Sequence, residues 1–172
     1  MLRPYRLDDA ATVFAAIEET RASLERWVPD IGHRRSVADV RSGLAFLSAA
    51  AAKDCSRFVL GVWDRSTDEF LGEIGLYTID HERHVGEVGY WLRERARGHG
   101  FIAEALETLA EHAQHMIGLR YLEAHVASEN AASRRVLERL GFTVVGHRAP
   151  APHWDGEVAD VLIYSRATRG GL

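Results

Sequence analysis

At 172 residues, 47% of them hydrophobic, the chain is long enough for one soluble domain with a substantial core. Its formal net charge of −4 argues against a nucleic-acid-binding protein that relies on general basicity, and its single cysteine, Cys55, excludes an internal disulfide and suits a reducing compartment. No apolar run reaches ~18 residues and the first residues lack the apolar core of a signal peptide, so we expect a cytoplasmic protein with no membrane or nucleic-acid partner.

The first part of the chain is predicted to be mainly helical. A short strand is expected over residues 2–7, and Asp8 or Asp9 is suited to cap the helix that follows, because a carboxylate accepts hydrogen bonds from the free N–H groups of a helix start. The helical spacing of apolar residues predicts helices over 8–20, around Leu24 and Trp27 up to Pro29, and over 36–52.

The remainder is predicted to alternate strands with two helices. Apolar segments bounded by turn-forming residues predict strands over 57–64, 70–80, 86–94, 121–127, 142–148 and 158–165. The helices are expected over 100–117, with its apolar residues on one stripe, and over 130–141. This order predicts an α/β (α+β) fold, in a single domain over 1–172, whose mixed and mostly antiparallel sheet has helices on both faces.

Two glycines, Gly98 and Gly100, stand one residue apart at the entrance to the helix over 100–117. Glycine costs backbone entropy, so it is favoured where the chain needs a positive φ or where a ligand approaches the backbone. A helix start also carries unsatisfied N–H groups and the positive end of the helix dipole. Together these features predict an anion site, most often one for phosphate.

Two other phosphate-binding motifs and a purely structural role are alternatives for this turn. A Walker phosphate loop is excluded because no Gly-Lys-Ser/Thr is present. The segment GHGFIA formally satisfies the dinucleotide fingerprint, and Glu123 lies about 20 residues further on, where a ribose-binding acid belongs. That motif normally opens a doubly wound parallel sheet, whereas antiparallel strands are expected here. The structural alternative is a helix that begins on a tight turn beside exposed arginines.

The motifs around the turn resemble those of the GNAT N-acetyltransferase superfamily. The run Arg95-Ala96-Arg97-Gly98-His99-Gly100 is similar to its R/Q-x-x-G-x-G/A coenzyme signature. The segments GYWL, GFIAEAL and SENAASRRVLERLGF resemble the RimJ/RimL-like branch, which acetylates the N-termini of ribosomal proteins. LRPYRLDDA, Trp27 and the closing DVLIY strand fit the same branch, so the resemblance covers essentially the whole chain.

The resemblance implies acetyl-CoA as co-substrate, with its pyrophosphate on the glycine turn. The strand before the turn would splay from its neighbour, and the pantetheine arm would pair with the exposed strand backbone. Asn130 matches the asparagine that contacts this arm, although it is also suited to cap a helix. The coenzyme-contacting residues implied in this way are Trp91, Leu92, Arg93, Arg95, Arg97, Gly98, His99, Gly100, Phe101, Ile102, Asn130, Ser133 and Arg135.

The implied reaction is direct attack of an amine on the acetyl thioester. It needs a neutral amine, stabilisation of the carbonyl oxyanion, for which a backbone N–H near Leu92 is a candidate, and a proton for the departing thiolate. An α-amine with a pKa of ~7.7–8 costs roughly 1–1.4 kcal/mol to deprotonate at pH 7, whereas a lysine amine near ~10.4 costs more than ~4 kcal/mol. An enzyme for N-termini can therefore work with a weaker base.

Candidate bases are His125 and Glu87, with Glu73 on a strand that should border the same cleft. His125 precedes Asn130 by five residues, the spacing of a glutamate base in a related branch, and an imidazole ordinarily titrates near neutral pH. The alternative for each of these residues is an ordinary surface or structural role.

The proton donor is a departure from the family pattern. Leu137 stands where many members of the superfamily have a tyrosine, seven residues after the asparagine. Ser133 matches the serine of the RimL-like branch and is the candidate hydrogen-bond donor to the coenzyme sulfur. Its alternative role is that of a small residue near a helix start. His153 and Trp154 are further candidates for the border of the acceptor site.

No metal site is expected, because His112 and His115 at helical spacing lack a completing set of cysteines or acids. The favoured function is acetylation of a primary amine, in particular a protein N-terminus such as that of a ribosomal protein. A small-molecule acetyltransferase for antibiotics or polyamines, and a non-catalytic acyl-CoA-binding sensor, remain alternatives. A homodimer is expected as a further possibility because dimers are common in the branch.

Overall fold

The computed structural model describes residues 1–28, 31–53, 57–152 and 158–168. Its strands form one seven-stranded sheet in the order β1-β2-β3-β4-β5-β7-β6. Neighbouring strands run antiparallel except β4 and β5, which run parallel. The predicted mixed, mostly antiparallel sheet is confirmed. The strands are β1 (Leu2–Arg3), β2 (Phe58–Trp63), β3 (Phe70–Asp80), β4 (Val85–Leu92), β5 (Tyr121–Ala127), β6 (Thr143–Pro152) and β7 (Val158–Ala167).

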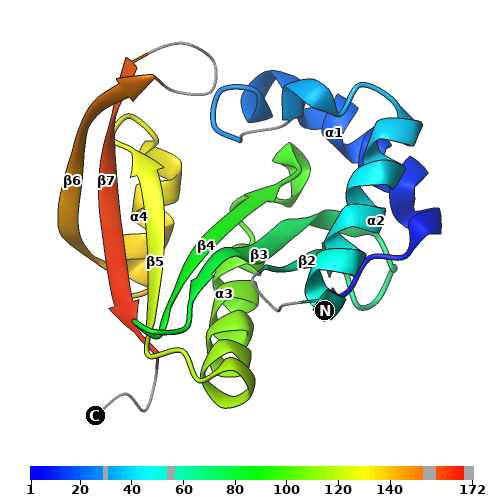
Figure 1. Cartoon of the computed structure of the whole chain (residues 1–172). Coiled ribbons are helices and arrows are strands. Elements are labelled where there is room, and N and C mark those ends of the chain that lie inside the picture. Colours follow the sequence, from blue (N-terminus) through cyan, green and yellow to red (C-terminus); the bar gives the residue numbers. More distant parts are fainter. Residues whose placement is uncertain (29–30, 54–56, 153–157, 169–172) are drawn as a thin grey trace.

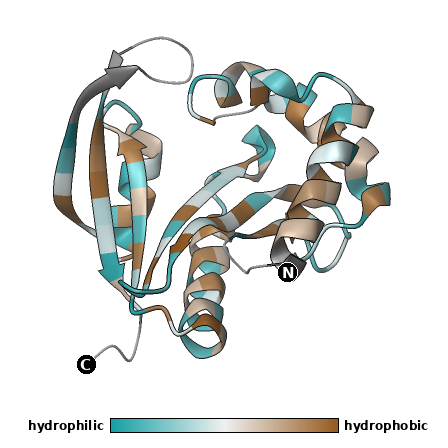
Figure 2. Ribbon diagram, in the orientation of Figure 1, coloured by the Kyte–Doolittle hydropathy of each residue, from teal (hydrophilic) through white to brown (hydrophobic). Residues whose placement is uncertain are grey.

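Helices cover both faces of the sheet, as predicted (Figure 1). Helices α1 and α2 share one buried apolar cluster with Trp63, Phe70 and Trp91, and helices α3 and α4 contribute to a second cluster on the other face. Figure 2 shows α3 with alternating hydrophobic and hydrophilic bands, as expected for a helix with one face on a sheet. The α-helices are α1 (Ala10–Leu24), α2 (Val37–Lys53), α3 (Phe101–His112) and α4 (Ala131–Arg139). A π-helical turn, Ala113–Ile117, extends α3 to the end expected from the sequence.

The structure corrects the predicted elements near the N-terminus. The strand expected over 2–7 ends at Arg3, because Pro4 has no N–H group to donate to a neighbouring strand. The helices expected over 8–20 and around Leu24 are the single helix α1, and Trp27 lies in the turn that follows it. Asp9 precedes α1, but its carboxylate binds the Arg3 guanidinium at 2.8 Å instead of capping the helix.

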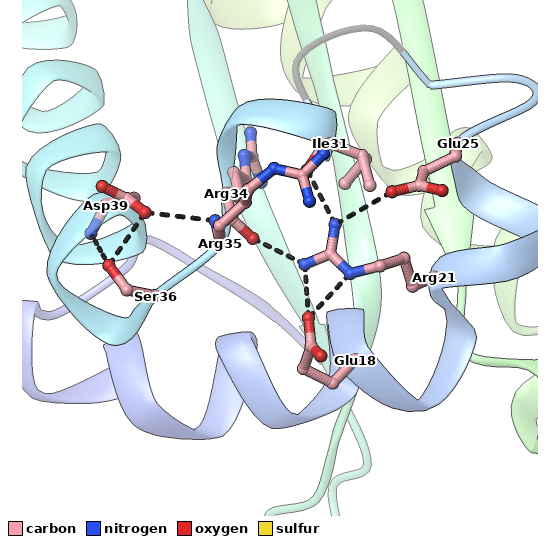
Figure 3. A network of polar contacts seen from close by, with 8 residues as sticks. All are labelled: Glu18, Arg21, Glu25, Ile31, Arg34, Arg35, Ser36 and Asp39. Carbon is pink, nitrogen blue, oxygen red and sulfur yellow. Dashed lines mark hydrogen bonds and ion pairs between the residues drawn. The ribbon is translucent and has the colours of Figure 1, made fainter.

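Residues 31–36, which precede α2, are held by polar contacts from both helices (Figure 3). The guanidinium of Arg21 donates hydrogen bonds to the carbonyl oxygens of Ile31 and Arg34, at 3.0 and 2.6 Å, and it also pairs with Glu18 of α1 and with Glu25, which directly follows the helix. Asp39 of α2 accepts hydrogen bonds from the other end of the loop. The fixed loop places the Arg34 guanidinium 3.7 Å from the carboxylate of Glu73 on β3.

Candidate active site

Strands β4 and β5 pair only where they begin. Their register joins Val85–Glu87 to Tyr121–Glu123, and no pairing between the two strands continues through the described residues beyond. Figure 1 shows the two strands diverging from this point. The predicted splayed strand pair is therefore present, and it leaves a gap in the middle of the sheet.

The backbone of β4 presents alternate residues to this gap. The Arg93 N–H donates to the Leu71 carbonyl of β3 at 2.9 Å, whereas the His84 carbonyl accepts from the Tyr121 N–H of β5 at 3.1 Å. Since successive residues of a strand direct their N–H and C=O groups to opposite sides, odd-numbered residues of β4 face β3 and even-numbered ones face the gap. Among the residues implicated in pantetheine pairing, Leu92 thus faces the gap.

This alternation separates the backbone roles expected for neighbouring residues. The main-chain groups of Trp91 and Arg93 are directed to β3, where the register pairs Trp91 with Glu73. Tyr90, which the sequence analysis did not single out, joins Leu92 at the gap because it is the even-numbered residue before it. The Leu92 carbonyl also accepts a hydrogen bond from Arg97 Nε at 3.2 Å, so its N–H is the group left for a ligand.

The turn before α3 has two glycines in the left-handed region. Gly98 has a φ of +79° and Gly100 a φ of +83°, and a Cβ atom at either position would meet no atom within 4 Å. The requirement for glycine is therefore one of backbone conformation and not of space. Gly100 directly precedes the first residue of α3, Phe101, on which the ring of His99 stacks. The side chain of Ile102 is buried in the core, so only its backbone is available to a ligand.

The arginine that ends β4 is a structural group. Arg93 is 8% exposed, and its guanidinium contacts Glu19 of α1 and Glu69 before β3, the latter at 3.1 Å. The hydrogen bond from Arg93 lowers the pKa of Glu19. Arg95 pairs with Glu69 at 2.6 Å, but its side chain is 56% exposed. The two carboxylates therefore fasten the end of β4 to α1 and to the residue before β3, and they leave Arg95 at the surface.

The side chain of Arg97, the third arginine of this region, extends from the turn to α1. Arg97 is 45% exposed and donates to the Ser23 hydroxyl at 2.8 Å as well as to Leu92. Arg135 is exposed on α4. Arg95 and Arg97, both expected to contact the coenzyme, lie where their guanidinium groups are accessible.

The start of α4 lies beside the gap-facing residue of β4. Asn130 caps α4, with its side-chain oxygen accepting the Ser133 N–H at 3.1 Å. The Ser133 hydroxyl lies 3.0 Å from the hydroxyl of Tyr90. Burial raises the pKa of Tyr90 to about 12. Leu137, at the position of the family's usual tyrosine, is fully buried in the core. A tyrosine hydroxyl thus reaches α4 from β4. The sequence did not indicate this contact, because it depends on how β4 and α4 pack together in the folded protein.

The two candidate bases lie together. His125 Nδ1 is 3.4 Å from Glu87 Oε1, and the two side chains are 28% and 37% exposed. Leu122, Ala124 and Val126 of β5 are buried against α3 and α4, so His125 lies on the opposite face, as predicted. Two residues that the sequence analysis treated as alternatives are therefore one pair across β4 and β5.

Glu73, the third carboxylate considered, has a structural environment. It is 1% exposed and accepts hydrogen bonds from the hydroxyls of Tyr5 and Tyr77, at 2.8 and 3.0 Å. Burial, together with the Glu73 carboxylate, raises the pKa of both tyrosines well above the usual value. With these partners and Arg34 beside it, the Glu73 carboxylate ties β3 to Tyr5 and to the segment before α2.

Other predicted features lie elsewhere. His153 and Trp154 fall outside the described residues. His112 stacks on Phe58 with ring centroids 5.0 Å apart, and His115 contacts the Glu111 carbonyl. In the described part of the chain no three His, Cys, Asp or Glu side chains are grouped to hold a metal ion. Across residues 1–28, 31–53, 57–152 and 158–168, no helix is long and apolar enough to span a membrane.

A mixed sheet opened between two parallel strands, with a glycine turn and a helix start beside the opening, defines the class of protein as an α/β domain whose candidate site lies at this opening. The chain belongs to the acetyltransferase (GNAT) domain family, whose sequence model matches residues 1–143. An uncharacterized N-acetyltransferase of Bacillus licheniformis is 32% identical over 105 residues, which cover 61% of this chain and 59% of that protein. The ribosomal-protein-serine acetyltransferase of Escherichia coli is 32% identical over 99 residues, which cover 58% and 55%. The matches thus span little more than half the length of these curated relatives.

Solved structures share the fold over nearly the whole chain. RimL, a ribosomal-protein α-N-acetyltransferase solved with coenzyme A, has a TM-score of 0.90 at 20% identity and covers 96% of this chain and 92% of its own. RimJ of Mycobacterium smegmatis, solved with a coenzyme A disulfide, has a TM-score of 0.87 at 27% identity and covers 96% and 80%. These similarities confirm the predicted GNAT fold.

Proposed function

We propose that the protein transfers the acetyl group of acetyl-CoA to a primary amine, in particular a protein or peptide N-terminal α-amine. The observation that carries this proposal is that the gap between β4 and β5 lies next to the glycine turn before α3. The exposed edge of β4 leads directly to a glycine turn at the start of α3. A cytoplasmic location suits the single cysteine, and the homodimer expected from the branch stays a prediction.

The coenzyme is proposed to lie along this edge. Backbone N–H groups at residues 98–102 favour a pyrophosphate, because a helix start offers unpaired donors and positive potential. Arg95 and Arg97 add charge-assisted hydrogen bonds if they leave their present partners. Tyr90 offers main-chain groups for the amide-bearing pantetheine arm, and the Leu92 N–H lies next along the same edge. Relatives of this family were solved with coenzyme A, which supports the same ligand here.

The chemistry is proposed to use four groups of the chain. The amine nitrogen attacks the thioester carbonyl carbon, a C–N bond forms, and the Leu92 N–H stabilises the oxyanion. His125 accepts the proton that the amine loses, with Glu87 orienting its imidazole through Nδ1. The C–S bond then breaks, and the Ser133 hydroxyl donates a hydrogen bond to the departing thiolate.

The exposure of the proposed base favours an α-amine over a lysine side chain. His125 and Glu87 are both partly open to solvent, so neither is a buried, strongly activated base. Neutralising an α-amine at pH 7 costs roughly 1–1.4 kcal/mol, about 3 kcal/mol less than a lysine amine. The names of the ribosomal-protein relatives point to the same acceptor class.

A panel of acceptors tests the proposal. Release of free coenzyme A from acetyl-CoA is measured with peptides that begin with Ser or Ala, the same peptides with a blocked N-terminus and an internal lysine, aminoglycosides, and spermidine. We expect turnover with the free N-termini and not with the blocked peptides. Turnover confined to the small amines would assign a small-molecule acetyltransferase. Acetyl-CoA binding by calorimetry without turnover would assign a sensor, and absence of binding would reject the assignment altogether.

A further inference from the structure

The hydroxyl of Tyr90 meets the first turn of α4. Its oxygen lies 3.0 Å from Ser133 Oγ and 3.4 Å from the Ser133 carbonyl oxygen, although the residues are 43 positions apart in the sequence. The ring of Tyr90 packs against the apolar cluster formed with α3 and α4. Because packing fixes the ring, the position of its hydroxyl relative to Ser133 is fixed as well.

The direction of this hydrogen bond follows from the chemistry of the two hydroxyls. A phenol is a stronger acid than an aliphatic alcohol and hence the better donor. Burial raises the pKa of Tyr90 to about 12, so the phenol keeps its proton throughout the neutral range. The phenol proton has two acceptors within reach on Ser133, Oγ at 3.0 Å and the carbonyl oxygen at 3.4 Å, and we take the nearer one, Oγ, as its acceptor.

Accepting from Tyr90 leaves the proton of Ser133 for another partner. A hydroxyl has one proton to donate and can accept from other groups at the same time. The Ser133 N–H is already committed to Asn130, and within the described residues its hydroxyl has no hydrogen-bond partner besides Tyr90. The serine proton is thus directed away from the phenol.

We propose that Tyr90 is a positioning residue for Ser133, whose hydroxyl it orients so that the serine proton points to the sulfur of the coenzyme. The inference rests on the proposed acetyl transfer. Tyr90 supplies through the serine what the absent tyrosine at position 137 would supply directly. Its main chain faces the gap that the pantetheine arm is proposed to occupy, so one residue would both line the coenzyme site and orient the donor.

Steady-state kinetics of coenzyme A release test the inference, with kcat and KM measured for wild type, Y90F, S133A and the double variant. We expect Y90F to lower kcat about tenfold, as for the loss of one hydrogen bond in the transition state, with the KM for acetyl-CoA unchanged. The double variant is expected to be no slower than S133A, because Tyr90 acts only through the serine.

Tyr164→Phe is the matched control. The Tyr164 hydroxyl also contacts α4, donating to Glu138 at 2.8 Å and accepting from Arg134 at 3.3 Å, but it does not touch Ser133. We expect Y164F to keep the wild-type kcat, and thermal unfolding of both variants measures any general loss of stability. Equal losses of kcat in Y164F and Y90F would show a structural role and overturn the inference.

The remaining outcomes separate the two proposals. If the wild-type protein turns over and Y90F has the same kcat, the role of Tyr90 is overturned while the proposed function stands. The same holds if the losses of Y90F and S133A multiply in the double variant. Failure of the wild-type protein to release coenzyme A with every acceptor would overturn the proposed function and this inference with it.

Discussion

His125 and Glu87 show how much depends on the direction of single side chains. Each residue lies on a strand that borders the gap, and the period of two along each strand directs both to the face opposite the cluster formed with α3 and α4. Their 3.4 Å separation supports the proposal that His125 is the base and Glu87 its orienting partner.

Replacing the imidazole tests this pair. We expect H125Q to lower kcat about 100-fold, because general-base assistance typically contributes at least this factor. E87Q is expected to lower it about tenfold, since the imidazole stays but loses its orienting carboxylate. The assay is coenzyme A release with an N-terminal peptide. Glu123→Gln is the control, because Glu123 stands opposite Glu87 in the sheet register and is assigned no role in the reaction. A wild-type kcat in H125Q would remove His125 as the base.

Substitution of the glycines of the turn can distinguish their effect on backbone conformation from their effect on ligand binding. Gly98, Gly100 and Gly118 all have a φ near +80° and open space at the Cβ position, and Gly118 lies at the far end of α3. Alanine at each is expected to reduce the free energy of unfolding by about 1 kcal/mol, the cost of a left-handed conformation. Only G98A and G100A should weaken acetyl-CoA binding measured by calorimetry. Equal affinities in all three variants would contradict a phosphate site at this turn.

Strand β4 belongs to two environments at once, bonded to β3 along one edge and open along the other. Hydrogen exchange should report this division residue by residue. In the free protein the amides of Tyr90 and Leu92 are expected to exchange faster than those of Gly89 and Trp91, which are directed to β3. Acetyl-CoA is expected to slow the first pair selectively. Protection spread evenly along the strand would argue against pairing of the ligand with this edge.

The secondary elements were largely predictable because their signals are local. Turn residues and apolar periodicity placed β5 at its observed bounds and α3 with its extension close to them. The failures have physical reasons too. Pro4 ends β1 by lacking an N–H group, and the continuation of α1 to Leu24 depends on packing of its buried residues against α2 and the sheet.

For the molecule as a whole, buried tyrosines predict a loss of stability at alkaline pH. The pKa of Tyr5 and of Tyr77 is raised well above 10 by burial and by Glu73, and that of Tyr90 is raised to about 12 by burial. An unfolded tyrosine ionises near pH ~10, so the unfolded chain loses these protons first. Stability is therefore complete below pH ~10 and falls above it, by up to about 1.4 kcal/mol per pH unit for each tyrosine.

Urea unfolding at a series of pH values above and below 10 measures this slope. Tyr77→Phe removes one of the raised groups, and its stability should fall less steeply with pH than that of the wild type, whatever its stability at neutral pH. A slope identical to that of the wild type would mean that Tyr77 ionises equally in the folded and unfolded chains.

Local pattern was sufficient for the order of elements, the glycine turn and the family, because periodicity, turn chemistry and short motifs involve residues close together in the chain. The pairing of His125 with Glu87, the gap-facing groups of β4 and the contact of Tyr90 with Ser133 required the folded sheet. Each depends on strand register and on which neighbour a backbone group bonds, and these are properties of segments that meet only after folding.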